Sequence, residues 1–259
     1  MVFSAIPFLL YFLPVFLLVY TLAPKRWQNP VILFFSLFFY AWGAPLFIFV
    51  LVASTITDFY LVRALHRASA AGRRKAFLIT SLSLNLGLLA YFKYANFFVD
   101  NVNDLLVGLG LEAVSWMEVA LPIGISFYTF QTLTYAIDVY RRVHTPLDRV
   151  SDYLVYIMSF PQMIAGPIVR YQEVAEQLRE RVTSTDDKLL GFFRFTIGLA
   201  KKVFIANVLG QYANDIFDGE LANLDLATAW LGAIAYAGQI YYDFAGYSDM
   251  AIGLGRMMG

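Results

Sequence analysis

The sequence has no cysteine and only two histidines among its 259 residues. Without cysteine, this chain cannot contain a disulfide framework, a thiolate metal site or a cysteine nucleophile. The two histidines, His66 and His144, lie among arginines, with no nucleophile motif or buried partner beside them. We interpret both as solvated loop residues and expect no metal site.

Charge is also scarce: charged residues make up 15% of the chain, hydrophobic residues 59%, and the mean hydropathy is +0.62. A soluble domain of this length could not bury so much apolar surface. Phosphate-binding glycine loops, zinc-ligand spacings and nucleophile elbows are missing. The basic residues cluster beside apolar segments, which membrane topology explains without a nucleic-acid partner.

Uncharged apolar segments recur at about the length, roughly 20 residues, that crosses a bilayer as a helix. The first, Ala5–Leu22, is interpreted as a retained span, because the first cations, Lys25 and Arg26, follow it. The pattern predicts an all-α fold: a polytopic transmembrane helix bundle in the lipid bilayer, forming a single integral membrane domain over residues 1–259.

The uneven distribution of charge predicts the topology. The stretch Arg63–Lys75 carries five cations and no acidic residue, which is typical of a cytoplasmic loop, whereas Asp100–Glu118 carries four acids and no cation. We therefore expect a multi-pass membrane protein, with its N-terminus outside and about six or seven crossings.

Several elements have expected bounds. The block Trp27–Thr57 is broken at Gly43-Ala44-Pro45 into a hairpin, whose first arm, Val31–Trp42, is short for a full span. The other expected crossings are Ala76–Phe92, Val119–Ile137, a weak one near Val203–Asn214, and Leu226–Tyr242.

The segment Tyr153–Val169 is interrupted by Pro161 and by Gly166-Pro167 and has cations on both sides. We interpret it as re-entrant or broken, beside a central cavity that satisfies its backbone. Tyr171–Asp187 is expected to be a cytoplasmic surface helix, and Lys188–Lys202 a helix lying at the inner interface.

Carboxylates at membrane depth are costly and mark candidate sites. Asp58 and Asp138 lie near the cytoplasmic ends of their spans, so pairing with an arginine such as Arg63 or Arg141 is the favoured interpretation. The segment Tyr241–Asp249 combines hydroxyls and carboxylates and is a stronger candidate.

Six short stretches carry a resemblance to a known family: Met1–Ser4, Tyr91–Phe97, Leu121–Tyr128, Ile137–Arg141, Ile164–Pro167 and Asp243–Gly253. With them, the chain from Met1 to Gly259 resembles the bacterial alginate O-acetyltransferase branch of the membrane-bound O-acyltransferases. The resemblance implies transfer of an acyl group, with acetyl the expected one, from a cytoplasmic donor to a hydroxyl of an extracytoplasmic polysaccharide. The transfer would be direct or would pass through acyl-relay partner proteins. The donor would be acetyl-CoA or an acyl carrier, used as substrate, with no bound cofactor.

In the family a histidine works near a tunnel, in a motif that would follow Gly259, so the resemblance implies no catalytic residue in this chain and no activity for the chain alone. Gln162 departs from the histidine that alginate-type members often have. The residues expected to line the cavity or the substrate path are Gln162, Gln239, Asp243, Tyr247, Ser248 and Asp249.

Two other functions stay open. A transporter would also use broken helices and midplane carboxylates, although it predicts paired repeats that the sequence does not show. A non-catalytic membrane scaffold in a polysaccharide export or modification assembly is the other. The acceptor could be alginate, cellulose, peptidoglycan or teichoic acid, the last with D-alanine as the acyl group.

Overall fold

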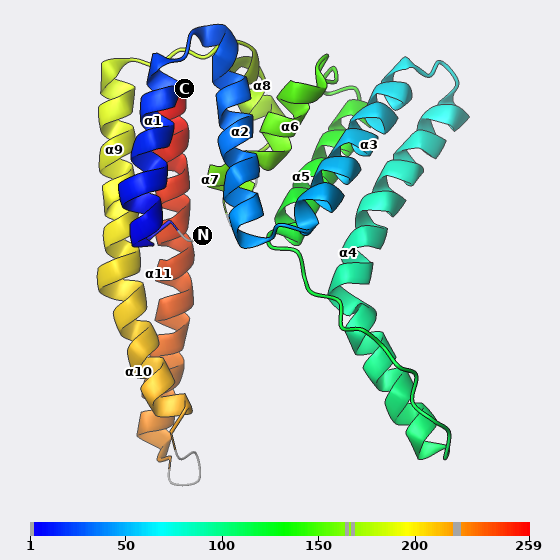
Figure 1. Ribbon diagram of the computed structural model, residues 1–259, viewed down its shortest axis with the longest axis vertical. Helices are drawn as coiled ribbons and strands as arrows, with labels where there is room; N and C mark the ends of the chain where they lie inside the picture. The colour runs from blue at the N-terminus through cyan, green and yellow to red at the C-terminus, as the bar shows by residue number, and fades with distance from the viewer. Residues whose placement is uncertain (1–2, 164–165, 167–168, 220–223) are drawn as a thin grey trace. The chain divides into compact units, whose positions relative to one another are not determined.

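A computed structural model describes residues 3–163, 166, 169–219 and 224–259, and within these residues the chain is helical and has no strand. This confirms the predicted all-α class. The helices, two of them π-helices (η), are η1 Phe8–Phe12, α1 Leu13–Leu22, α2 Lys25–Gly43, α3 Phe47–Arg67, α4 Ala71–Gly108, α5 Ile125–Tyr140, α6 Val150–Met158, α7 Phe160–Met163, α8 Tyr171–Arg179, α9 Thr185–Ala200, η2 Lys201–Ala206, α10 Asn207–Phe217 and α11 Leu226–Met258 (Figure 1).

The chain divides into two compact units, and each is described by itself. The first unit comprises Met1–Phe35, Ala165–Pro167 and Ala175–Gly259, and the second comprises Ser36–Ile164 and Ile168–Val174. Whether the two form the single integral membrane domain expected above stays a prediction.

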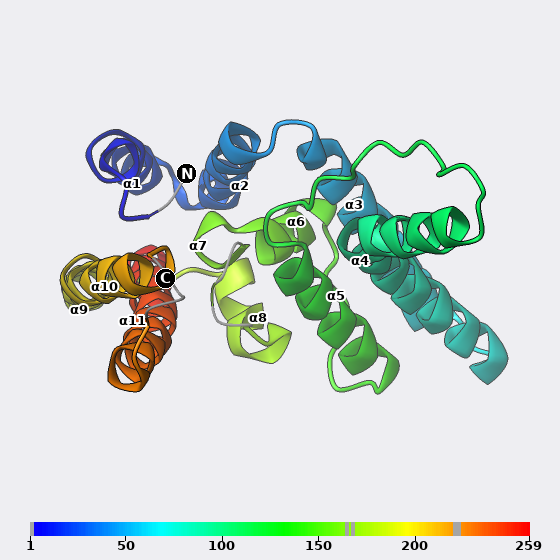
Figure 2. The same ribbon diagram turned by 90° about the horizontal axis from the view of Figure 1, so that it is seen from below.

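In the second unit, α3, α4 and α5 lie side by side and α6 contacts both α3 and α5 (Figure 2). The hairpin between α2 and α3 turns at Gly43-Ala44-Pro45, as predicted, because proline cannot continue the preceding helix. The predicted interruption after Tyr153 is also confirmed: α6 ends at Met158, Ser159 leaves the helical conformation, and α7 is four residues long. Gly166-Pro167 falls partly outside the described residues.

In the first unit, α11 packs along one continuous helix made of α9, η2 and α10 (Figure 1). The N-terminal helix joins this pair: the ring of Phe3 stacks on Tyr247 with centroids 4.7 Å apart, and the Tyr20 hydroxyl donates to the backbone carbonyl of Met258. Lys188–Lys202 and Val203–Asn214 are therefore parts of one helix, and the separate elements predicted there are wrong.

Helix α4 is much longer than the predicted span, since it runs for 38 residues to Gly108. The first half of the expected loop Asp100–Glu118 is thus helical. Residues 109–124, which connect α4 to α5, form an irregular strap that returns along α4 (Figure 1). Asn103 Nδ2 donates to the Val114 carbonyl while its Oδ1 accepts from the Val114 N–H, and Asn96 forms the same reciprocal pair with Val119 at 2.9 Å for both bonds.

Three predicted bounds also change. Helix α2 begins at Lys25, with Pro30 inside it, so the arm predicted as the short Val31–Trp42 is 19 residues long. Helix α5 starts at Ile125, because Pro122 and the left-handed Gly124 (φ 76°) interrupt the segment predicted to be helical from Val119. Helix α8 ends at Arg179, and residues 180–184 separate it from α9.

Two helices of the described part of the chain, α3 and α4, are long and apolar enough to cross a membrane by length and composition. Phe8–Leu22 is a shorter apolar helix. Many large apolar side chains are exposed on these segments, for example Leu10, Leu18, Phe49 and Phe98. Such an exposed apolar surface fits a lipid-facing protein better than a water-soluble one.

Candidate functional site

A seam of charged side chains joins α11 to the helix beside it. The Lys202 ammonium lies 2.7 Å from Asp243, and the Asp249 carboxylate lies between Lys201, at 2.6 Å, and Arg194, at 3.1 Å. We call these five residues the charged seam. Both lysines belong to π-helix η2, and π-helical turns occur frequently at functional sites.

Glycines allow the two helices to approach closely enough for this seam to form. A Cβ added to Gly198 would lie 2.5 Å from the carbonyl oxygen of Gly246, and one added to Gly191 would lie 2.6 Å from that of Gly253. The two pairs are one heptad apart on each helix, so they lie on the same face of an antiparallel pair. Any larger side chain would separate α9 from α11 and lengthen the ion pairs.

Three more sequence candidates belong to α11. Tyr247 stacks on Phe3, whereas the Ser248 hydroxyl and the Gln239 amide oxygen are buried and have no hydrogen-bond partner among the described residues. Gln239 also fills the space over Gly210, where an added Cβ would meet its side chain at 2.8 Å. Unpartnered buried polar atoms are rare, and those of Gln239 and Ser248 are the two on α11 that a ligand or another part of the protein could satisfy.

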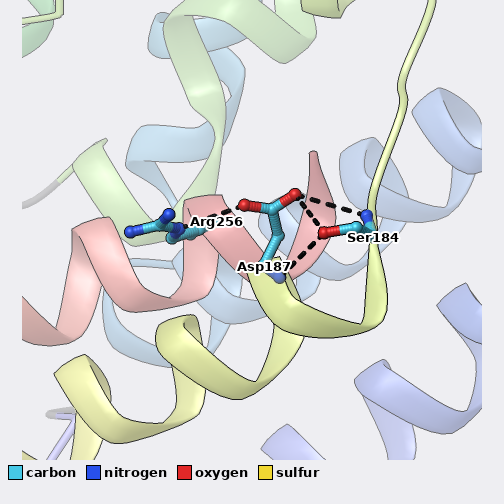
Figure 3. A network of polar contacts seen from close by, with 3 residues as sticks. All are labelled: Ser184, Asp187 and Arg256. Atoms are coloured by element: carbon cyan, nitrogen blue, oxygen red, sulfur yellow. Dashed lines mark hydrogen bonds and ion pairs between the residues drawn. The ribbon is translucent and has the colours of Figure 1, made fainter.

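The far end of the same helix pair is fixed by a second polar network, which Figure 3 shows in close-up. Ser184 and Asp187 form a reciprocal capping box at the start of α9, and Arg256 from the last turn of α11 lies 3.3 Å from Asp187. The hydrogen bonds from Ser184, followed by the Arg256 guanidinium, lower the pKa of the Asp187 carboxyl. This network aligns α11 with α9 at the end remote from η2.

The second unit contains a buried polar cluster centred on Asp58. Its carboxylate accepts hydrogen bonds from Ser81, from Asn85 at 3.0 Å and from the Tyr153 hydroxyl at 2.7 Å. Asp58, Ser81 and Tyr153 are fully buried, and these donors come from α4 and α6. The predicted pairing of Asp58 with an arginine is wrong: neutral donors stabilise the carboxylate instead, because Arg63 is turned toward the Asp148 carbonyl.

Gln162 lies in this unit, apart in sequence from the α11 candidates. The break at Ser159 leaves the Tyr156 carbonyl without the backbone donor that a continuing helix would supply, since the Phe160 N–H donates to Ser36. Gln162 and Gln131 both donate to this carbonyl, Gln131 at 2.8 Å. The Gln162 side chain thus supplies one of the hydrogen bonds that replace the missing backbone donor at the end of α6. A place for Gln162 at a substrate path stays a prediction.

Tyr153 of the polar cluster belongs to a group of four tyrosines whose rings are in contact: Tyr135, Tyr153, Tyr156 and Tyr171. The rings of Tyr135 and Tyr153 are 4.9 Å apart, and the Tyr135 hydroxyl accepts the Leu147 N–H at 2.7 Å. Sequence reasoning missed these tyrosines, and it missed Ser81 and Asn85. The available signal was the i, i+4 spacing of Ser81 and Asn85 on one face of an otherwise apolar helix.

The two histidines do not form a catalytic arrangement within the described residues. His66 is exposed near the end of α3, and His144 is half-buried with Nε2 3.4 Å from the Gln172 side chain and its ring edge against Tyr171. Asp138 makes no ion pair with Arg141 or with another described cation, so that predicted pairing is also wrong.

The chemistry of these groups is limited. Aspartates paired with lysine and arginine position helices, and their oxygens are occupied by the cations and are not available to accept a proton from a substrate. Among the described residues, no group of three or more His, Asp or Glu side chains is placed to hold a metal ion. The six candidates divide between the units: Gln162 lies in one, and Gln239, Asp243, Tyr247, Ser248 and Asp249 lie together on α11 in the other.

Comparison with known proteins adds a family and named relatives. The family described as MBOAT, membrane-bound O-acyltransferase, matches residues 149–259, which include α6 to α11 and the charged seam. Over the whole chain, identity is 42% to a probable alginate O-acetylase of Pseudomonas aeruginosa, of which the chain covers 50%.

Two further relatives carry different names. A peptidoglycan O-acetyltransferase of Helicobacter pylori is 32% identical over 96% of the chain, with 52% of that protein covered. A teichoic acid D-alanyltransferase of Bacillus subtilis is 32% identical over 53% of the chain, with 35% of that protein covered. The chain therefore spans about half the length of the alginate and peptidoglycan relatives that it matches.

Proposed function

We propose, since the chain belongs to the membrane-bound O-acyltransferase family, that the protein containing it transfers an acyl group to hydroxyls of an extracytoplasmic polysaccharide. The observation that carries the proposal is the match along the whole chain, at 42% identity, to a probable alginate O-acetylase. It makes acetyl the favoured acyl group and alginate the favoured acceptor. The names of two other relatives make peptidoglycan and teichoic acid the next candidates for the acceptor.

The donor in this proposal is acetyl-CoA or an acyl carrier on the cytoplasmic side, and acyl-relay partner proteins receive the group where the acceptor is remote. The helices then form a polytopic bundle in a bacterial inner membrane, with the N-terminus outside and a central cavity between the two sides. The charged seam supports this placement, because its carboxylates are matched by cations, and paired charges are the form in which ionisable groups occur at membrane depth.

Within the cavity, Gln239 and Ser248 are the residues of this chain best suited to contact substrate. Their buried amide and hydroxyl oxygens have no partner in the part of the chain that the structure describes, so a hydroxyl of the acceptor or an amide of the donor would gain hydrogen bonds without displacing existing ones there. Asp243 and Asp249 would act as positioning residues that fix α11 through Lys202, Lys201 and Arg194.

We also expect the 259-residue polypeptide alone to be inactive. Acyl transfer to a hydroxyl needs a general base, and neither histidine of this chain is oriented by a carboxylate in the structure. The paired aspartates of the charged seam do not replace it.

The test compares the gene product that contains this sequence with the 259-residue polypeptide. Each is reconstituted in vesicles, radiolabelled acetyl-CoA or acetylated carrier is supplied on one side, and alginate on the other. We expect label on the polysaccharide with the gene product and none with the polypeptide. Donor uptake into the lumen without labelled hydroxyls would contradict the proposal and favour a transporter, and labelling by the polypeptide would refute the expected inactivity.

A further inference from the structure

A basic hollow lies where α3 meets α4, and none of its lining residues is among those considered for acyl transfer. Its volume is about 640 Å³, within the range of about 300 to 1,000 Å³ that is usual for ligand pockets. Its lining residues are Tyr60, Arg63, Ala64, Arg67, Ala68, Arg73 and Phe77, and we call it the arginine pocket.

The pocket is built by two stripes of side chains. On α3 the lining residues from Tyr60 to Arg67 are spaced i, i+3, i+4 and i+7, and on α4 Arg73 and Phe77 are spaced i and i+4. Such spacings put each set on one helix face. The short turn of residues 68–70 holds the two faces toward each other, and both helices belong to the second unit.

The charges in the pocket are unbalanced. Three guanidinium groups line it and no carboxylate does. Arg63 is anchored, because one N–H donates to the Asp148 carbonyl at 2.9 Å and its guanidinium lies over the Phe59 ring. Arg67 and Arg73 make no hydrogen bond or ion pair with any residue that the structure describes. Their donors remain available to a ligand.

The side chains that line the pocket indicate which class of ligand it binds. Arginine binds phosphate through paired N–H donors and is weakly hydrated, which favours it over lysine for this purpose. Helix α4 begins two residues before Arg73 with no side-chain cap and no acidic residue in its first turn, so the positive end of its dipole adds to the field. Tyr60, Phe77 and the two alanines provide an apolar wall for a part of the ligand that carries no charge.

We propose that the arginine pocket binds the headgroup of an anionic phospholipid that carries two phosphates, with its acyl chains along the apolar wall. Two phosphates neutralise most of the charge of three guanidiniums, whereas a monoanionic headgroup leaves it largely unmatched. The pocket lies at the joined ends of the two helices that are long enough to span a bilayer, which is where headgroups lie. The inference uses the proposed membrane placement and is independent of acyl transfer.

The experiment is native mass spectrometry of the 259-residue chain released from detergent micelles containing cardiolipin, phosphatidylcholine or inorganic phosphate. We expect one cardiolipin to be retained, and no phosphatidylcholine or phosphate. The double variant Arg67→Gln, Arg73→Gln should weaken cardiolipin binding by about thirtyfold, because each basic side chain near an anionic lipid contributes roughly fivefold.

Matched variants distinguish binding by the arginine pocket from a general effect of the chain's positive charge. Lys75→Gln with Arg141→Gln removes the same charge from exposed positions outside the pocket and should change affinity less than about twofold. Arg67→Lys with Arg73→Lys keeps the charge and should lose part of the binding, because lysine lacks the paired donors. Circular dichroism checks that every variant is folded.

Three results would overturn the proposal: equal cardiolipin binding by wild type and the glutamine double variant, an equal loss in the Lys75 and Arg141 control, or retention of inorganic phosphate in place of the lipid. The last would assign the pocket to a soluble phosphate compound. None of these results bears on acyl transfer, which the vesicle assay measures separately.

Discussion

Asp58 illustrates how an aspartate side chain can be kept inside this protein without a neighbouring cation. Its two oxygens accept three hydrogen bonds, from Ser81 and Asn85 on one helix and Tyr153 on another. Each of these donors would be left unsatisfied in a buried position if the carboxylate were removed. The residue thus links α3, α4 and α6.

Replacing Asp58 by alanine should therefore destabilise the second unit by at least about 2 kcal/mol, since several buried donors lose their acceptor together. Asp58→Asn keeps one acceptor oxygen and should cost less. Thermal unfolding followed by circular dichroism in detergent measures both. Asp100→Ala, at an exposed position of α4, is the control and should unfold like the wild type. Equal melting temperatures for Asp58→Ala and the control would contradict a stabilising role.

Asp187 should make the start of α9 sensitive to acid. Ser184 and Arg256 lower the pKa of this carboxyl below its ordinary value of 3.8, so the folded state binds its proton more weakly than the unfolded state does. The resulting stability is complete above the ordinary pKa and is lost as the pH falls through the lowered one.

The measurement is the difference in melting temperature between the wild type and Asp187→Asn, taken from about pH 6 down to about pH 2.5. The difference should shrink as the pH falls. Asp186→Asn, one residue before and without a hydrogen bond to the capping serine, provides the control. A difference that stays constant across this range would exclude a contribution from Asp187 ionisation.

At this scale the sequence predicts types of residue better than partners. Carboxylates in apolar segments are recognisable as candidates, and Asp58, Asp243 and Asp249 are indeed all hydrogen-bonded or ion-paired. Their partners are far away in sequence, from 23 to 95 residues for Asp58, and only the packing of helices brings them together. Spacing in the sequence therefore predicted that a nearby arginine pairs with Asp58, whereas its partners in the structure are neutral donors from distant parts of the chain.

Among the elements, the contact of α9 with α11 depends on glycine. The backbones meet at Gly198 and Gly246, and a Cβ on Gly198 would lie 2.5 Å from a carbonyl oxygen and 2.7 Å from a backbone nitrogen. Both of these atoms belong to the backbone of α11, which cannot move aside as a flexible side chain can.

Gly198→Ala should accordingly destabilise the helix pair by about 1 to 3 kcal/mol, the usual range for overpacking a well-packed contact. Gly255→Ala is the matched control, because no heavy atom lies within 4 Å of its added Cβ and alanine has the higher helix propensity. Thermal unfolding of the two variants gives the comparison. If Gly198→Ala melts at or above the control, the close backbone contact is not a constraint on folding.

Helix positions could be predicted better than helix lengths. Turn signals worked where the backbone itself must break, at Gly43-Ala44-Pro45 and at the interruption of residues 153–163. Bounds placed at charged residues failed, because α4 continues past Asp100, and α9 continues through Lys201 and Lys202 as η2. Charges end a membrane span, but they do not end a helix whose backbone hydrogen bonds are intact.

For the whole molecule, the proposed topology is testable with single cysteines, since the natural chain contains none. Ser69 lies in the turn between α3 and α4, and Ser115 lies in the strap, both exposed. With the positive-inside orientation, a membrane-impermeant maleimide should label Ser115→Cys in intact spheroplasts and Ser69→Cys only after permeabilisation.

The unsubstituted chain gives the background, and permeabilised cells give the maximum for each variant. Labelling of Ser69→Cys alone in intact cells would reverse the orientation, and equal labelling of both would show that α4 does not cross the bilayer. The orientation, the number of crossings and the association of the two units all depend on the membrane and on longer-range packing, which the hydropathy of single segments does not encode.

The strap of residues 109–124 has a consequence for how variation in this chain can be interpreted. Two amide side chains on α4, Asn96 and Asn103, bind the backbone of Val119 and Val114, and Asn96 Oδ1 also accepts a hydrogen bond from the Trp116 indole N–H at 3.0 Å. The side chains of Val114 and Val119 can therefore change with little effect on the path of the strap, whereas a change at either asparagine would release one of its two attachments to α4. Part of the information that specifies this loop is thus stored in the helix beside it, outside the loop's own sequence.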